Sequence, residues 1–135
     1  MESSTNTEEQ MKAILQEAVT AIQSMNVSDM TQLKSISTPT PIVELTCTAL
    51  MILFGVSKKD CNWARWKKFA ANPNELLNMM MVLDKDNIKA ETIKTLKTHL
   101  SKEPDYCREL VASKSKACEG IAAYVIGMIK YYEAL

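Results

Sequence analysis

The strongest constraint in the sequence is a heptad pattern at each end of the chain. From Met11 onward, apolar side chains recur at alternating steps of four and three residues, at the seam positions Leu15, Ala18, Ile22 and Met25. Toward the other end, the same alternation runs from Val111 past the single polar position Lys114 to Leu135, through the seam positions Cys118, Ile121, Val125, Met128 and Tyr132. Such patterns are typical of helices that pair along one apolar stripe.

The two seams predict two long helices that pair with each other, over residues 8–36 and 106–135. Asp105, after Pro104, is the expected cap of the second helix, whose first part is expected to belong to a head. The chain between the helices must reverse direction, which predicts an all-α fold: an antiparallel two-helix coiled-coil stalk base capped by a small helical-bundle head. The alternative is that both helices are outer members of an ordinary bundle. Residues 1–7 are expected to be disordered or an added start.

Residues 37–105 are predicted to form the head. After Pro39 and Pro41, the apolar run 42–54 predicts a buried helix that Gly55 ends. The next helix places three aromatic residues on one face, and sharing a face favours core packing over nucleic-acid stacking for them. These residues are Trp63, Trp66 and Phe69.

The second half of the head continues in helices. The order Asn72-Pro73 is typical of a helix start, and the apolar block 76–83 with its methionine triplet is expected in the core. A polar turn at 84–87 lacks the glycine and the distal glutamate of a calcium loop. An amphipathic segment, 88–100, precedes the last turn at 101–105. Ile93, Leu96 and Leu100 are expected to point inward, and Lys89, Lys94 and Lys97 outward.

Composition excludes several classes of function. The apolar run 42–54 is shorter than the roughly 20 residues that span a membrane, and Glu44 interrupts it. The four cysteines show no Cys-x-x-Cys spacing and His99 is the single histidine, so zinc is not expected. The cysteines are expected to be reduced, with a disulfide as the alternative. No phosphate loop or catalytic motif occurs, which argues against an enzyme or a bound cofactor.

Charge is divided unevenly along a chain whose net charge is zero. Residues 34–116 hold fourteen Lys or Arg against nine Asp or Glu, a net charge of +5, between ends of −4 and −1. A basic centre points weakly to an acidic partner, because a solvated lysine-rich surface gives the same count.

Several segments in colinear order resemble the microtubule-binding domain at the tip of the dynein heavy-chain stalk. They are the proline joint STPTPIVELTCTALMILFG, the tryptophan helix NWARWKKFAANP, the turn LDKDNI, the segment PDYCRELVASKSKACEG and the tail IGMIKYYEAL. The resemblance covers roughly residues 8–135, and the SKSKACEG block and the KYYE ending look closer to axonemal than to cytoplasmic dyneins.

The resemblance implies a monomeric fragment of a much larger motor, located in the cytoskeleton of a cilium or flagellum axoneme. Its partner would be the acidic tubulin lattice of a microtubule, without nucleic acid or membrane, and the ATPase ring would lie outside this chain. The stalk helices would slide past each other by about half a heptad to report the state of the ring. The residues that match the contact regions of the family are Glu44, Lys89, Lys94, Lys97, Arg108, Glu109, Lys114 and Lys116.

Two positions depart from the family pattern. Glu44 stands where cytoplasmic members carry a lysine, and Ser113 stands where they carry an arginine, with Lys114 beside it. Each lost cation weakens attraction to an acidic lattice, so we expect modest affinity that is sensitive to salt. The alternative function is a generic helical adaptor that binds a partner helix through an apolar groove, and its binding would be insensitive to salt. An enzyme is the third reading.

Overall fold

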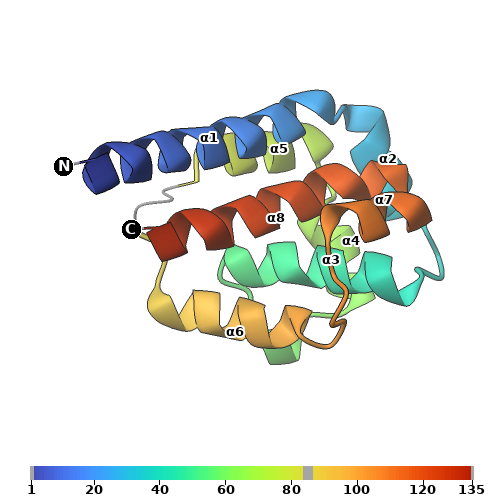
Figure 1. The fold of residues 1–135 in the computed structure, drawn as a ribbon. Helices are drawn as coiled ribbons and strands as arrows, with labels where there is room; N and C mark the ends of the chain where they lie inside the picture. Colours follow the sequence, from blue (N-terminus) through green and yellow to red (C-terminus); the bar gives the residue numbers. More distant parts are fainter. Residues whose placement is uncertain (1, 84–86, 135) are drawn as a thin grey trace.

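The computed structural model describes residues 2–83 and 87–134 and forms an all-helical bundle (Figure 1). Within those residues no strand occurs, so the predicted fold class is confirmed. The elements in chain order are α1 (Glu2–Ser24), α2 (Val27–Ser35), α3 (Pro41–Leu53), the short 3₁₀ turn η1 (Lys58–Asp60), α4 (Trp63–Phe69), α5 (Pro73–Met81), α6 (Ala90–Leu100), α7 (Arg108–Lys114) and α8 (Lys116–Ala134).

The first and last helices pack side by side and run in opposite directions. Figure 1 shows α1 in blue beside α8 in red, with the N and C ends at the same end of the molecule. The pair is not isolated, because α5 also contacts α1 and α3 contacts α8. Buried side chains from both helices belong to the same apolar core as those of the head. The antiparallel pairing is therefore confirmed, and over the described residues the paired helices are also walls of the bundle.

The predicted single helix over residues 8–36 is wrong at one point, because the chain leaves the helix between α1 and α2. Asn26 adopts extended backbone angles and caps α2. The backbone N–H of Asp29 donates to Asn26 Oδ1 at 2.8 Å, and the N–H of Asn26 donates to Asp29 Oδ2 at 3.1 Å. This reciprocal capping box satisfies two donors that a helix start leaves free. The structure begins α1 at Glu2, within the segment 1–7 that is predicted to be disordered or an added start.

A second break divides the predicted helix over residues 106–135. Ser115 has extended backbone angles and separates α7 from α8, and its Oγ accepts a hydrogen bond from the N–H of Cys118 at 3.3 Å. The expected cap at Asp105 is wrong as well. Cys107 caps α7, and its Sγ accepts from the N–H of Leu110 at 3.4 Å.

The predicted seam positions lie in the core. Leu15 and Tyr132 are half-buried and pack against it, whereas Leu135 lies outside the described residues. The other seam positions are buried: Ala18, Ile22, Met25, Cys118, Ile121, Val125 and Met128. Sequence reasoning missed Gly120 and Gly127 of α8, which lie directly against α1.

The helix after the prolines, α3, lies at the centre of the head. Pro41 occupies its first turn, where a missing N–H costs nothing, and Gly55 follows its end with a φ of 93° that favours glycine. The aromatic cluster predicted from α4 is confirmed by fully buried Trp66, whose ring centroid lies 6.2 Å from that of Trp63 and 6.1 Å from that of Phe69.

The start of α5 agrees with the prediction, whereas α6 begins at Ala90 rather than at Ile88, and one apolar block is only partly buried. Asn72 caps α5 as expected, and its side chain accepts from the N–H of Glu75 at 3.3 Å. Leu76 and Met80 are buried, whereas the expectation that the whole block 76–83 lies in the core is wrong. Met79, Met81 and Val82 are exposed.

The turn predicted at 84–87 falls largely on 84–86, outside the described residues. In α6 the expected inward side chains of Ile93 and Leu96 are buried, and Leu100 is half-buried. Among the described helices, none combines the length and apolar character that crossing a membrane requires.

Candidate functional site

Two exposed lysines of the α6 region form no ion pair with the residues that the structure describes. Lys89 caps the start of α6 and Lys94 lies one turn into it, and neither forms an ion pair with any described residue. Lys97 differs, because its Nζ lies 2.6 Å from Oε2 of Glu133 at the far end of α8. Both side chains of that pair are about half exposed, so the contact contributes little to stability. Lys97 would have to leave Glu133 before it could meet a partner.

The joint between α7 and α8 carries a second group of cations. Lys114 and Lys116 are exposed on either side of Ser115 and form no ion pair within the described part of the chain. Arg108, in contrast, already has two carboxylate neighbours. Its Nε lies 3.0 Å from Oε2 of Glu119, and its Nη1 lies 3.6 Å from Oε1 of Glu17 on α1.

A groove connects this joint to the start of α3. It has a volume of about 890 Å³ and lies between the α7–α8 joint, α2 and the first turn of α3. Arg108, Lys114 and Lys116 line it from one side, and Asp29 of α2 and Thr40 before α3 also line it. The extended backbone at Ser115 thus places the ammonium groups of Lys114 and Lys116, which have no ion-pair partner among the described residues, beside the proline joint.

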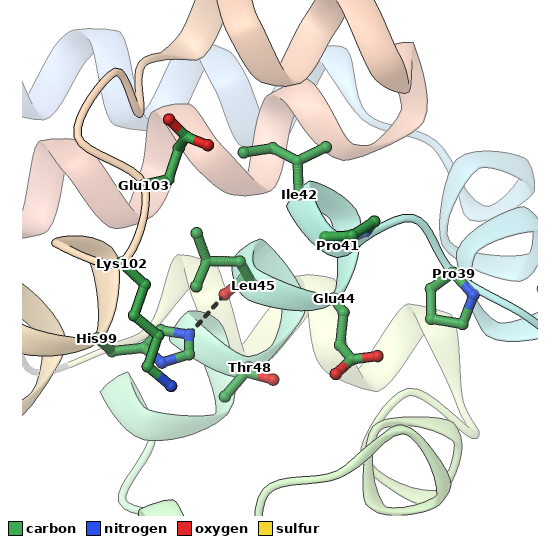
Figure 2. Close-up of a pocket in the computed structure, with 9 residues that line it drawn as sticks. All are labelled: Pro39, Pro41, Ile42, Glu44, Leu45, Thr48, His99, Lys102 and Glu103. Carbon is green, nitrogen blue, oxygen red and sulfur yellow. Dashed lines mark hydrogen bonds between the residues drawn. The ribbon is translucent and has the colours of Figure 1, made fainter.

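Glu44 lines a separate pocket of about 380 Å³ (Figure 2). It lies in the exposed first turn of α3, where a carboxylate is favoured by the free N–H groups of a helix start. Across the pocket lie Lys102 and Glu103, just after α6, and the wall is formed by Pro39, Pro41, Ile42, Leu45 and Thr48.

His99 closes this pocket on the α6 side and is only 4% exposed. Its Nε2 lies 2.9 Å from the carbonyl oxygen of Leu45, which can only accept, so Nε2 carries the proton and Nδ1 is a bare acceptor. No described group donates to Nδ1. Burial lowers the pKa of His99 from 6.5, and the nearby Lys102 and Lys58 ammonium groups lower it further. The ring is therefore neutral at pH 7.

The structure distributes the predicted contact residues over several neighbouring surfaces. Lys94 lines a hollow on α6, and Lys97, Arg108 and exposed Glu109 line a groove beside α8. Glu44 lines the pocket described above, and Lys114 and Lys116 line the groove at the α7–α8 joint.

Sequence reasoning missed two exposed lysines in the same surroundings. Lys58 of η1 lines the hollow with Lys94, and Lys102 lines the pocket with Glu44. The excess of positive charge over residues 34–116 was the available signal. It could not place either lysine, because each becomes a neighbour of the site through the packing of α6 on α3.

The cysteines form no disulfide and no metal site within the described residues. All four are free, and Cys47 and Cys118 are fully buried. Burial raises the pKa of the Cys47 thiol well above its ordinary value, which disfavours the reactive thiolate. No group of three or more potential ligands gathers to hold an ion in the part of the chain that the structure describes.

Known proteins resemble this chain in both sequence and fold. It is 29% identical over 121 residues to the dynein beta chain of the flagellar outer arm of Chlamydomonas reinhardtii, covering 88% of this chain. It is 30% identical over 119 residues to human dynein axonemal heavy chain 9, covering 86% of this chain. The chain spans only 3% of the length of each of these relatives.

The fold is that of a solved structure described as the microtubule binding domain of dynein-c. The two superpose with a TM-score of 0.77 at 23% sequence identity, over 93% of this chain and 87% of the other. The profile of one protein family, the microtubule-binding stalk of dynein motor, matches residues 3–135. Because that match takes in nearly every residue, the chain belongs to the family of dynein microtubule-binding stalks.

Proposed function

We propose that this chain is the microtubule-binding tip of a dynein heavy chain and that it works in the axoneme of a cilium or flagellum. The observation that carries the proposal is the family match over residues 3–135. The names of the relatives support the location, since they are flagellar, ciliary and axonemal dyneins. The chain corresponds to the stalk tip of those proteins, and ATP hydrolysis belongs to parts of the motor outside it. A nucleotide titration that detected binding to this chain would contradict that division.

The proposed tubulin-binding surface consists of α6, the α7–α8 joint and the first turn of α3. Four exposed lysines without ion pairs to any described residue supply its positive charge: Lys89, Lys94, Lys114 and Lys116. Unpaired surface ammonium groups can attract an acidic lattice without first losing an internal partner. Lys97, Arg108 and Glu109 lie at the edge of the surface, and the first two must exchange an internal carboxylate for one of tubulin.

Charge reversals test the cationic part of this surface. Lys94→Glu and Lys114→Glu should each weaken binding to microtubules by roughly threefold to tenfold in co-sedimentation at low salt, because each replaces an attraction by a repulsion. Lys12→Glu is the matched control, since Lys12 is an exposed lysine of α1 outside the proposed surface. Equal losses in the control and the test variants would show a dependence on net charge alone and would remove the surface assignment.

Glu44 tests the α3 part of the surface with the opposite sign. Its carboxylate faces the partner from an exposed position and repels an acidic lattice. Glu44→Lys should therefore raise affinity by roughly twofold to fivefold at low salt. The matched control is Glu9→Lys on exposed α1. Unchanged binding by Glu44→Lys would mean that the first turn of α3 does not meet tubulin.

We further propose that the affinity depends on the register between α1 and α8. A half-heptad slip moves one helix about 6 Å along the other and keeps an apolar seam, because a and d positions exchange. Neighbouring apolar pairs on α1 support this, since Ile14 adjoins Leu15 and Ala21 adjoins Ile22. Cross-linking the helices in each register should give two different affinities for microtubules, and equal affinities would refute the coupling.

A further inference from the structure

Two glycines of α8 face α1 at close range. Gly120 and Gly127 are seven residues apart and therefore lie on one face of the helix. A Cβ added at position 120 would lie 2.5 Å from Sδ of Met25 and 3.2 Å from the carbonyl oxygen of Ala21. A Cβ added at position 127 would lie 3.2 Å from the Cβ of Ala18. Only a residue without a side chain fits at position 120 while Met25 keeps its place.

The two residues that meet these glycines are also seven apart: Ala18 lies in α1, and Met25 directly follows its end at Ser24. Met25 faces Gly120 and Ala18 faces Gly127, as one antiparallel register requires. Met25 is 8% exposed and Ala18 is 1% exposed, so both contacts lie inside the packed interface. The Met25 side chain fills the volume that Gly120 leaves empty, and close-packed interiors do not tolerate either a void or an overlap at such a point.

A half-heptad slip removes this fit in either direction. When α1 moves four residues toward its C-terminal end, Ala21 takes the place of Met25 opposite Gly120; when it moves the other way, that place falls beyond Met25, where the chain has already left α1. Alanine is too small to fill the notch, and beyond Met25 no residue of α1 remains to fill it. Among half-heptad positions, the fit at Gly120 therefore selects the register seen here.

The second glycine gives the same preference. The slip that removes Ala18 from Gly127 replaces it with Ile14 or Ile22, depending on direction. Ala18 already lies within 3.2 Å of where a Cβ at position 127 would stand, so a larger side chain requires the two helices to move apart.

We propose that Met25 and Gly120 form a register notch that holds α1 and α8 in the arrangement seen here. The seam permits both registers, and the notch makes their free energies unequal. If binding of a partner is to shift the register, the free head must prefer one register, and the notch provides that preference. The effect of the notch on microtubule affinity rests on the register coupling proposed above, whereas its effect on stability does not.

A double-mutant cycle on the 135-residue chain tests the notch. Gly120→Ala should lower the equilibrium constant for folding by roughly tenfold, although alanine is the better helix former, because the new methyl group displaces Met25. Met25→Ala should also be destabilising, since it leaves a cavity. In the Gly120→Ala background, the factor by which Met25→Ala lowers the folding equilibrium constant should be at least tenfold smaller than beside the native glycine. Denaturant unfolding measures both factors.

The second glycine of α8 provides the control for Gly120→Ala. Gly127→Ala makes the same change in the same helix against the small side chain of Ala18 and should cost less than Gly120→Ala. If the double variant lowers the folding equilibrium constant by the product of the two single-variant factors, to within about twofold, the notch proposal is wrong. If Gly120→Ala alone does not fold, a double variant that regains folding supports the notch, and one that does not overturns it.

Microtubule co-sedimentation of the same variants separates the notch from the coupling. Gly120→Ala should change the affinity for microtubules by at least threefold, and adding Met25→Ala should reduce that change. A coupled cycle in stability with no change in affinity leaves the notch in place and refutes the register coupling. An additive cycle refutes the notch whatever the affinity does.

Discussion

At the scale of single residues, His99 makes the stability of the head depend on pH. Its ring is buried between α6 and α3, and its Nε2–H donates to the carbonyl oxygen of Leu45. Burial lowers the pKa of the folded ring from 6.5. As pH falls, the unfolded chain therefore takes up the proton before the folded one does. The contribution of neutral His99 is complete above about pH 6.5 and is lost as pH falls from there toward the lowered pKa.

We predict that the free energy of unfolding is level from pH 8 to 7 and declines from pH 6.5 to 5.5. A single histidine can account for at most about 1.4 kcal/mol over that last unit. His99→Gln should remove most of the decline, because glutamine can still donate to Leu45 and does not titrate. Urea unfolding at several pH values checks this. A parallel decline in both proteins would assign the effect to other groups.

At the scale of elements, local capping decides where the two terminal segments break. Periodicity predicted the helices and their apolar faces, because the spacing of the apolar residues at 15, 18, 22 and 25 is visible in the sequence itself. It could not show the breaks, since no proline or glycine marks Asn26 or Ser115. The signal at Asn26 was present in the pair Asn26 and Asp29, which has the spacing of a capping box.

Other features of the elements could not be predicted from the sequence because tertiary packing decides them. The run 76–83 is largely apolar, and only the arrangement of neighbouring helices decides that Met80 is buried while Met81 and Val82 are exposed. The same holds for Lys97, whose partner Glu133 lies 36 residues away in sequence. Charge counting found the lysine and could not find its carboxylate.

The capping box gives a stability prediction. Asn26→Ala should lower the free energy of unfolding by about 1 kcal/mol, because it leaves the N–H of Asp29 without its acceptor. In a chain of this size, that corresponds to a fall of roughly 2–5 °C in Tm. Asn78→Ala, at a position inside α5 away from the caps, is the control and should change Tm little. Equal shifts in a thermal melt would contradict the role of the cap.

At the scale of the whole molecule, the paired helices and the head share a single core. The seam residues of α1 and α8 lie in the same apolar cluster as the buried side chains of α3 and α4. A movement of α1 along α8 must therefore repack part of the head, and packed cores change between discrete arrangements rather than continuously. This continuity supports the proposed link between the register of the helices and the surface offered by α6 and the α7–α8 joint.

The central claim is that the chain binds microtubules through its exposed lysines. Co-sedimentation of the unaltered chain with microtubules at low and moderate ionic strength tests it most directly. We predict measurable binding at low salt that weakens as salt rises, because exposed charge pairs are screened. Absence of binding at low salt would contradict the claim. Binding that does not change with salt would contradict it too, and would indicate contact through apolar surface instead.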